Sequence, residues 1–434
     1  MMKPAEDPDP GQGDAAGRIG IREWIGKYAA ILVALFLTAG VILASPFLQP
    51  PFLLSILVVL CSGILYLIRG TRAISLSIIV LAVLYGLTWL PLLIFVITLG
   101  IVVGGEIAYR ASRGGDHRYL TYLAASSAGG GLVLLYLAAI RYLDQVRPIL
   151  LLLILLGVLV AVLLKAALQE RNDILMVEGL GVAMTMYLFA DLNIPVENTG
   201  LLTAGAIIAL SFGYIAFRFR VADVSGLFSG SLVGVILIVF ADVRWFLVML
   251  VFLVIGSAST RYRYKVKEAA GIAQSHGGVR GYVNVFANCL VGVAAAVLYA
   301  LSGENPLALA LFLGSVATAA ADTMGGEIGM TSREPVLITT LEPVPKGTNG
   351  GITLLGEGAS LVASAAVALS AYLFGLGTPS MLLFVTVAGF AGSNVDSLVG
   401  ALFENKGFIG NAGTNLAATL GGGLVALVLA LFFL

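Results

Sequence analysis

Long apolar segments follow one another along almost the whole chain, and they decide what it can fold into. Each is about 17–24 residues long, enough for a helix to cross a hydrocarbon core about 30 Å thick. No water satisfies backbone N–H and C=O groups in that core, so each crossing segment has to be helical. The sequence therefore predicts an all-α, polytopic integral membrane protein with about 15 transmembrane helices. The segments lie near 27–45, 52–68, 73–90, 92–109, 119–140, 148–165, 174–190, 200–217, 225–241, 244–260, 281–301, 306–328, 352–375, 381–400 and 412–434.

Charge supports this class and gives an orientation. Only 11% of the residues are charged, against about 25% in soluble proteins. With a cytoplasmic N-terminus, all Lys and Arg residues except Arg141, Arg147 and Arg244 fall on the inner side. Because positive residues stay inside, we predict a multi-pass protein of the cell membrane with a cytoplasmic N-terminus and an outward C-terminus. The polar loops then face the cytoplasm, at 261–280, 329–351 and 401–411.

Composition divides the chain further and excludes some functions. Residues 1–22 are rich in Pro, Gly and Asp and are predicted to be a disordered cytoplasmic tail. We assign 23–200 to an N-terminal transmembrane domain of unknown role and 201–434 to a second domain that carries the motifs. The net charge is zero, which argues against binding to nucleic acid.

Two carboxylates stand where one apolar segment ends. Asp322 and Glu327 are placed to hold a divalent metal ion, since carboxylate oxygens are preferred ligands of Mg²⁺. Five residues along a helix turn through about 500°, which leaves the two side chains roughly 140° apart. They share a metal only if the helix breaks at Gly325-Gly326. In the alternative interpretation both acids are simply solvated at a helix end.

A glycine-rich turn follows these acids at the start of the next apolar segment. Glycines permit the positive φ angles of a backbone nest that binds anions. In the alternative interpretation, Thr348 or Asn349 only caps the following helix. The candidate phosphate-binding residues are Lys346, Gly347, Thr348, Asn349, Gly350 and Gly351.

A third acid, Asp396, lies at a similar depth near the end of another apolar segment. Small residues around it allow close approach of a neighbouring helix. We predict that Asp396 joins Asp322 and Glu327 as a catalytic residue and metal ligand. The alternative is that it hydrogen-bonds only to a helix partner.

Polar residues also mark the long loop before the segment at 281–301. Its basic cluster over 261–267 is interpreted as membrane anchoring. Arg280, Asn284 and Asn288 repeat every four residues and so share one helix face, which we expect to point into the bundle and bind substrate. Asp223 is a weaker candidate for substrate binding, because it is equally suited to cap a helix.

Four of these stretches together resemble the family that contains transmembrane protein 19 and plant phytyl-phosphate kinase. The family patterns are close to DTxASE-G, ITTxxxVPxGTNGG, GSxVDSxLGA and RGxRQVxAN, and the resemblance covers about 205–434. Gly325-Gly326 stand in place of Ala-Ser, and Val283-Asn284 in place of Arg-Gln. If that arginine binds phosphate in the family, the donor or the acceptor differs here. The matching stretches are DTMGGEIG, ITTLEPVPKGTNGG, GSNVDSLVGA and RGYVNVFAN.

The resemblance implies a membrane-bound kinase that phosphorylates an isoprenoid (phytyl- or geranylgeranyl-type) monophosphate, with CTP as the favoured nucleotide. Mg²⁺ would be the cofactor, and membrane lipids, the prenyl phosphate and the nucleotide would be the partners. The alternative function is an ion-coupled secondary transporter that uses its intramembrane carboxylates. Clustering of the polar groups at one membrane face favours the enzyme.

Overall fold

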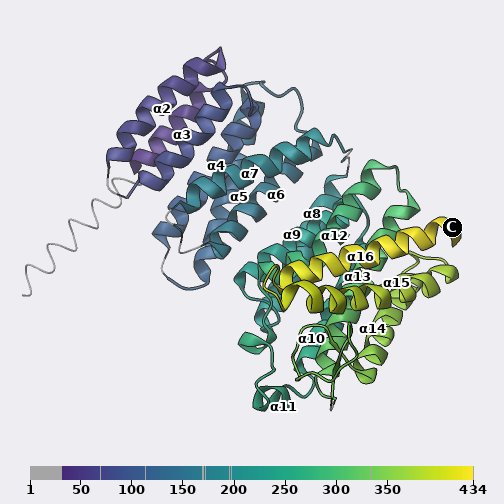
Figure 1. Cartoon of the computed structure of the whole chain (residues 1–434). Helices are drawn as coiled ribbons and strands as arrows, with labels where there is room; N and C mark the ends of the chain where they lie inside the picture. The colour runs from purple at the N-terminus through teal and green to yellow at the C-terminus, as the bar shows by residue number, and fades with distance from the viewer. Residues whose placement is uncertain are drawn as a thin grey trace, which may run out of the picture. The chain divides into compact units, whose positions relative to one another are not determined.

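The computed structural model describes residues 32–433 apart from positions 69, 113, 169, 170, 172, 195, 197 and 333. The tail expected at 1–22 and the beginning of the first predicted segment lie outside this range. The chain divides into two compact units, Met1–Asp191 and Leu192–Leu434. The boundary predicted after residue 200 falls just inside the first helix of the second unit, which begins at Thr199. Figure 1 follows the chain through both units.

Unit 1 consists of helices. Proline opens α2 and α6, where its missing N–H costs no hydrogen bond. Within the unit α4 packs against α5, α2 against α3, and α6 against α7. The helices are Leu32–Ala44, α2 Pro51–Leu67, α3 Arg72–Gly86, α4 Leu92–Ala111, α5 His117–Ala139, α6 Pro148–Ala167 and α7 Ile174–Asp191.

A buried charge cluster ties helices of unit 1 together. Glu106 of α4 forms ion pairs with Arg110 of the same helix and with Lys165 of α6. Lys165 also lies 4.8 Å from the centroid of the Tyr109 ring. The buried carboxylate therefore has cationic partners, as a charge inside an apolar bundle requires.

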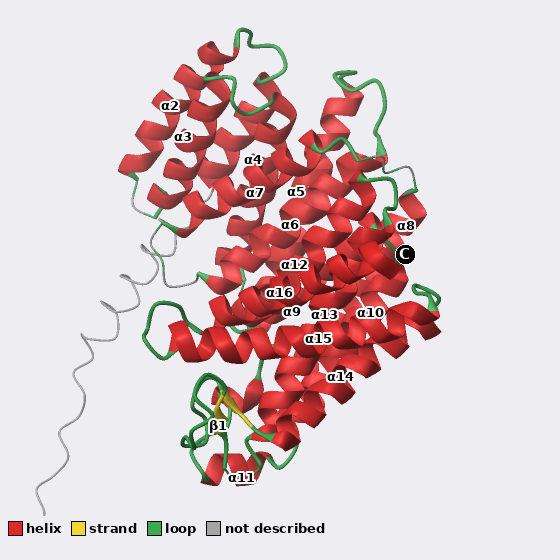
Figure 2. Cartoon of the chain, turned by 45° about the vertical axis from the view of Figure 1, so that its right-hand side comes forward, coloured by secondary structure: helices red, strands yellow, loops and turns green. Residues whose placement is uncertain are grey.

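Unit 2 is also helical, with one short hairpin, as Figure 2 shows. Strands β1 and β2 pair antiparallel, and the hairpin lies with α11 at one end of the unit's long helices. The elements are α8 Thr199–Arg218, α9 Val224–Phe240, α10 Val243–Arg261, α11 Tyr264–Ala269, a 3₁₀ turn Ser275–Gly278, α12 Tyr282–Leu301, α13 Pro306–Gly329, β1 Val336–Leu337, β2 Gly351–Ile352, α14 Leu354–Leu373, α15 Pro379–Val399, a π-helical turn Gly400–Glu404 and α16 Asn411–Phe433.

Helix α13 is the centre of unit 2 and contacts α10, α12, α14, α15 and α16. Small residues at its surface allow this close packing. A Cβ added to Gly314 would lie 3.1 Å from the Cα of Gly423 on α16, and one added to Gly389 of α15 would lie 2.7 Å from the Cβ of Ala317. The consequence is that the ends of several helices converge around the end of α13.

The all-α polytopic class is confirmed, since every predicted apolar segment contains a helix in the described part of the chain. Within that part, 11 helices are long and apolar enough to cross a membrane. The helix Leu32–Ala44 and α2, α3 and α9 are shorter. The exact number of crossings and the orientation of the termini remain predictions.

Candidate functional site

A polar cavity of about 280 Å³ opens at one end of unit 2. It lies where α13 and α15 end and where α12, α14 and α16 begin, with the loop before β2 over it. All the candidate residues from the sequence except Asp223 line it. They are Asp322, Glu327, Asp396, Lys346, Gly347, Thr348, Asn349, Gly350, Gly351, Arg280, Asn284 and Asn288.

Asp322 and Asp396 meet in this cavity. Asp322 lies two turns before the end of α13, Asp396 lies in the last turn of α15, and their carboxyl groups are within hydrogen-bonding reach of each other. The Oδ1 atom of Asp396 is buried and has no partner among the described residues. Two adjacent carboxylates repel unless a proton or a cation lies between them.

The helix break that would join Glu327 to this pair does not form. Helix α13 runs without interruption through Gly325-Gly326 to Gly329. Glu327 therefore points in a different direction from Asp322, as the angle along an unbroken helix requires. In the part of the chain that the structure describes, no group of three or more His, Cys, Asp and Glu side chains is arranged to hold a metal ion. The three-carboxylate centre is thus reduced to Asp322 and Asp396.

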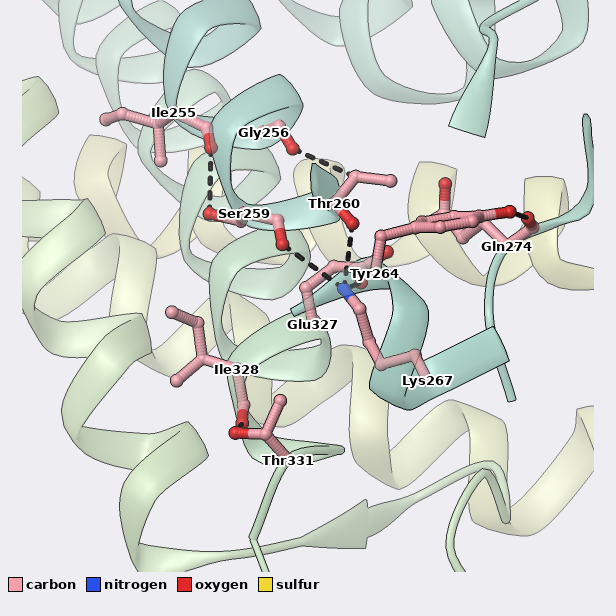
Figure 3. Close-up of polar contacts among 10 residues, drawn as sticks. All are labelled: Ile255, Gly256, Ser259, Thr260, Tyr264, Lys267, Gln274, Glu327, Ile328 and Thr331. Atoms are coloured by element: carbon pink, nitrogen blue, oxygen red, sulfur yellow. Dashed lines mark hydrogen bonds and ion pairs between the residues drawn. The ribbon is translucent and has the colours of Figure 1, made fainter. Parts of the chain in front are cut away.

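Glu327 instead forms a buried ion pair with Lys267 of α11, drawn in Figure 3. Both side chains are almost completely inaccessible, with 2% and 1% of their surface exposed. The Lys267 ammonium also donates to the carbonyl oxygens of Thr260, at 2.9 Å, and Ser259, at 3.3 Å, at the end of α10. This contact attaches the short helix α11 to α10 and α13 beside the cavity.

The interpretation of the basic cluster as membrane anchoring is wrong for Lys267, because this residue is buried and pairs with Glu327. The sequence gives no direct signal for its burial, because Lys267 stands among Arg261, Arg263 and Lys265 and its partner is 60 positions further on. The one available hint is an acid at the end of an apolar helix, which needs a partner when it is buried.

The glycine-rich loop forms a turn but does not cap the next helix. Gly347 and Gly350 have φ angles of 84° and 80°, values that favour glycine. Gly351 lies in β2, opposite Leu337. Thr348 donates its hydroxyl to the carbonyl oxygen of Pro345 at 2.7 Å, so it stabilises the turn.

The alternative interpretation, in which Thr348 or Asn349 caps the next helix, is therefore wrong. Thr353 caps α14, and its hydroxyl oxygen accepts a hydrogen bond from the Gly356 N–H at 3.0 Å. Because Gly351–Ile352 pair with β1, α14 begins only after them, at Leu354. The loop is attached to the end of α15 by the Asn405 side chain, which donates to the Asn349 carbonyl oxygen at 2.9 Å.

Cationic groups lie on two sides of the cavity. Lys346 is exposed at its rim, and among the described residues no ion pair to it is found. Arg280 enters from the wall, with its guanidinium carbon 5.1 Å from the centroid of the Phe252 ring. Desolvation lowers the pKa of Arg280, and the nearby Glu327 charge opposes that shift. A guanidinium keeps its charge in proteins, so both groups are available to an anion.

Asn284 and Asn288 continue the wall along the first turns of α12. Both line the cavity together with Arg280, as their four-residue spacing indicates, and Asn288 donates to the Asn284 carbonyl oxygen at 2.9 Å. Asp223 lies outside this wall. It caps α9 by accepting hydrogen bonds from the Gly226 N–H and the Ser225 hydroxyl, so the capping alternative describes it.

Some polar residues of the cavity are absent from the sequence prediction. Glu357 of α14 lines it and accepts a hydrogen bond from Asn394 at 3.1 Å. Asn411 and Asn415 contribute from the start of α16. Glu357 is an acid in the first turn of an apolar helix, which is a usable signal. The two asparagines carry no such signal, because they resemble ordinary residues at a helix start.

Comparison with known proteins identifies the part of the chain that holds this cavity. The family model described as integral membrane protein DUF92 matches residues 207–422. The uncharacterized membrane protein MJ0933 of Methanocaldococcus jannaschii is 37% identical over 211 residues, which cover 48% of this chain and 86% of the relative.

Two plant proteins are also similar to this chain. Protein PGR of Arabidopsis thaliana is 32% identical over 227 residues, covering 46% of this chain and 78% of PGR. Protein VTE6, chloroplastic, of the same plant is 32% identical over 197 residues, covering 44% of this chain and 59% of VTE6. No solved structure matches. These matches confirm the family that the four motifs indicate.

Proposed function

The chain belongs to the DUF92 family of integral membrane proteins, and from that premise we propose that unit 2 transfers a phosphoryl group from a nucleoside triphosphate to an isoprenoid monophosphate. The observation that carries the proposal is the single cavity that unites the Asp322–Asp396 pair, a glycine-rich loop and two cationic side chains. The motif resemblance to plant phytyl-phosphate kinase supports a phytyl- or geranylgeranyl-type acceptor.

Asp322 and Asp396 are the residues that would hold Mg²⁺. The buried, unpartnered Oδ1 atom of Asp396 fits a bound cation. In proteins Mg²⁺ commonly takes one or two carboxylates together with substrate phosphates and water, so two acids suffice. When bound, the ion would neutralise charge on the phosphates of the donor.

Groups opposite the acids would bind the phosphates. Thr348 and Gly351 use their N–H groups within the turn, so the N–H groups of Gly347, Asn349 and Gly350 remain as donors. The ammonium of Lys346 and the guanidinium of Arg280 also line the cavity. Fixed positive groups of this kind stabilise the transferring phosphoryl group, and catalysis of phosphoryl transfer depends mainly on such positioning.

The transfer of the phosphoryl group needs no proton acceptor. An oxygen of the acceptor phosphate forms a bond to the γ-phosphorus, the bond from that phosphorus to the β–γ bridging oxygen breaks, and a nucleoside diphosphate leaves. The acceptor is already an anion, so no general base is required. This fits the lining residues that the structure describes, none of which is a histidine. We further propose CTP as the donor and the cytoplasmic side as the location of the cavity.

The position of the cavity favours this enzyme over an ion-coupled transporter. Transporter sites lie near the middle of the membrane, at broken helices. Here the acids lie near helix ends, and α13 continues unbroken past its glycine pair. Coupled ion flux in liposomes without any phosphotransfer would nevertheless support the transporter.

The test supplies the purified full-length chain in lipid nanodiscs with Mg²⁺, one of the four nucleoside triphosphates and phytyl or geranylgeranyl monophosphate. Mass spectrometry of the lipid fraction measures the prenyl diphosphate. We expect product with at least one donor, CTP first among them. Absence of product in every combination, in protein shown to be folded, would overturn the proposal.

A further inference from the structure

A second, apolar cavity lies beside the polar one in unit 2. It has a volume of about 80 Å³ and is bounded by α8, α9, α10 and α12. Arg280 and Asn284 line both cavities, so the two adjoin at these side chains. Beyond this junction the walls are almost entirely apolar and include the aromatic rings of Phe212, Phe246 and Phe252.

Three glycines of α9 line this cavity, and one of them, Gly230, leaves open space. Gly226, Gly230 and Gly234 are spaced by four residues, so they share one helix face, and all three line the cavity. From the first to the last they extend roughly 12 Å along the helix axis. A Cβ added to Gly230 would have no heavy atom within 4 Å, which places open space at that position.

We infer that this apolar cavity, from here on the tail groove, holds the part of the prenyl chain next to the acceptor phosphate. The inference rests on the proposed function, because it names where that reaction's acceptor lies. A prenyl monophosphate has an anionic head joined directly to an apolar chain. At the junction, the guanidinium of Arg280 and the amide of Asn284 suit the anionic head. The apolar walls beyond them suit the chain.

The other substrate does not fit the tail groove. A nucleotide carries sugar hydroxyls and base nitrogens along its length, and these groups lose hydrogen bonds with water in an apolar cavity. The tail groove is also well below the roughly 300–1,000 Å³ of cavities that enclose a whole drug-sized ligand. The distal part of a long prenyl chain would therefore leave it and lie in the bilayer.

The first experiment measures occupancy and needs no turnover. A geranylgeranyl monophosphate with a diazirine close to its phosphate end is photolysed with the full-length chain, and the labelled peptides are mapped by mass spectrometry. Labelling should fall on the segments 209–216, 226–234 and 246–253, and excess unlabelled geranylgeranyl monophosphate should suppress it. Labelling confined to other helices, or labelling that only bulk phospholipid suppresses, would overturn the inference.

The second experiment fills the tail groove. Gly230→Leu should project a side chain into the open space and raise the KM for geranylgeranyl monophosphate at least tenfold, with the KM for the nucleotide unchanged. Gly358→Leu is the matched control, because Gly358 is also a helical glycine with no heavy atom near an added Cβ and lines neither cavity. An equal KM for the acceptor in both variants would contradict the inference.

The two experiments separate the inference from the proposed function. Labelling of the tail groove without any diphosphate product would retain the lipid site and reject the kinase. Product formation with labelling elsewhere would retain the kinase and reject the tail groove. Gly230→Leu is also checked by the photolabel, which it should reduce at least fivefold in protein that elutes as the wild type does.

Discussion

At the scale of single residues, the chemistry proposed for unit 2 depends on two aspartates that different helices bring together. Asp322 and Asp396 are separated by 74 positions in the sequence, yet their carboxyl groups are within hydrogen-bonding reach. Each aspartate is a candidate because it lies inside an apolar helix. Because α13 continues unbroken and directs Glu327 away from Asp322, the two aspartates remain as the pair. Glu327 could not be assigned in this way, because its direction depends on whether a helix continues through Gly325-Gly326.

The first prediction concerns this pair. Asp322→Asn and Asp396→Asn should each lower kcat by about 10²–10³-fold, the effect typical of losing one electrostatic group in an active site. Each variant should also need more Mg²⁺ for half-maximal rate. Kinetics over a range of Mg²⁺ concentrations measure both effects. Glu304→Gln changes an exposed acid outside the cavity and should behave as the wild type; equal activity in all three variants would remove the aspartates from the mechanism.

The second prediction concerns the buried ion pair of Lys267 and Glu327. Lys267→Met leaves a buried carboxylate without its partner and should cost about 3–5 kcal/mol. Glu327→Gln should cost less, because the amide still accepts a hydrogen bond from Lys267. Thermal unfolding in detergent gives the order of the variants. If Lys267→Met melts at the wild-type temperature, the pair contributes little to the folded state.

At the scale of elements, the helices could be predicted and the connections between them could not. Apolar length alone locates every helix of unit 2 that carries the site, since the membrane allows no other structure there. The hairpin of β1 and β2 and the capping of α14 by Thr353 arise from pairing across 13 intervening residues. That pairing leaves no periodic pattern, so the glycine-rich loop was expected to open the helix directly.

A third prediction follows from the geometry of this loop. Gly350 has a φ of 80°, and a Cβ there would lie 2.6 Å from the Cβ of Ala401 beyond α15. Gly350→Ala should therefore cost about 1–3 kcal/mol of local strain and raise the KM for the nucleotide. Gly358→Ala, in the second turn of α14, should be neutral or stabilising. Steady-state kinetics of both variants test this, and an unchanged nucleotide KM in Gly350→Ala would show that the loop does not bind the donor.

At the scale of the whole molecule, the site belongs to one of the two units. Every residue that lines the polar cavity and the tail groove lies between Leu192 and Leu434. The aligned 211 residues are 86% of the Methanocaldococcus relative, which is therefore about 245 residues long, close to the size of unit 2.

The fourth prediction is that unit 2 is active without unit 1. A chain of residues 192–434, purified in nanodiscs beside the full-length protein, should retain kcat within about tenfold, because the residues that would lower the barrier all remain. A monodisperse, helical unit 2 without activity, next to an active full-length protein, would show that unit 1 contributes to the reaction. Circular dichroism and gel filtration establish the folded state of both chains.

Transfer of an isotopic label from the nucleotide to the lipid is the decisive test of the proposed kinase. The full-length protein is incubated with Mg²⁺, CTP labelled in its γ-phosphate and geranylgeranyl monophosphate, and the lipid product is separated and counted. We predict that the label appears in the terminal phosphate of geranylgeranyl diphosphate. Glu304→Gln should transfer it equally well, and Asp322→Asn should transfer almost none. If folded wild-type protein leaves all the label in the nucleotide or in free phosphate, and does so with each of the other labelled triphosphates, unit 2 is not a prenyl-phosphate kinase.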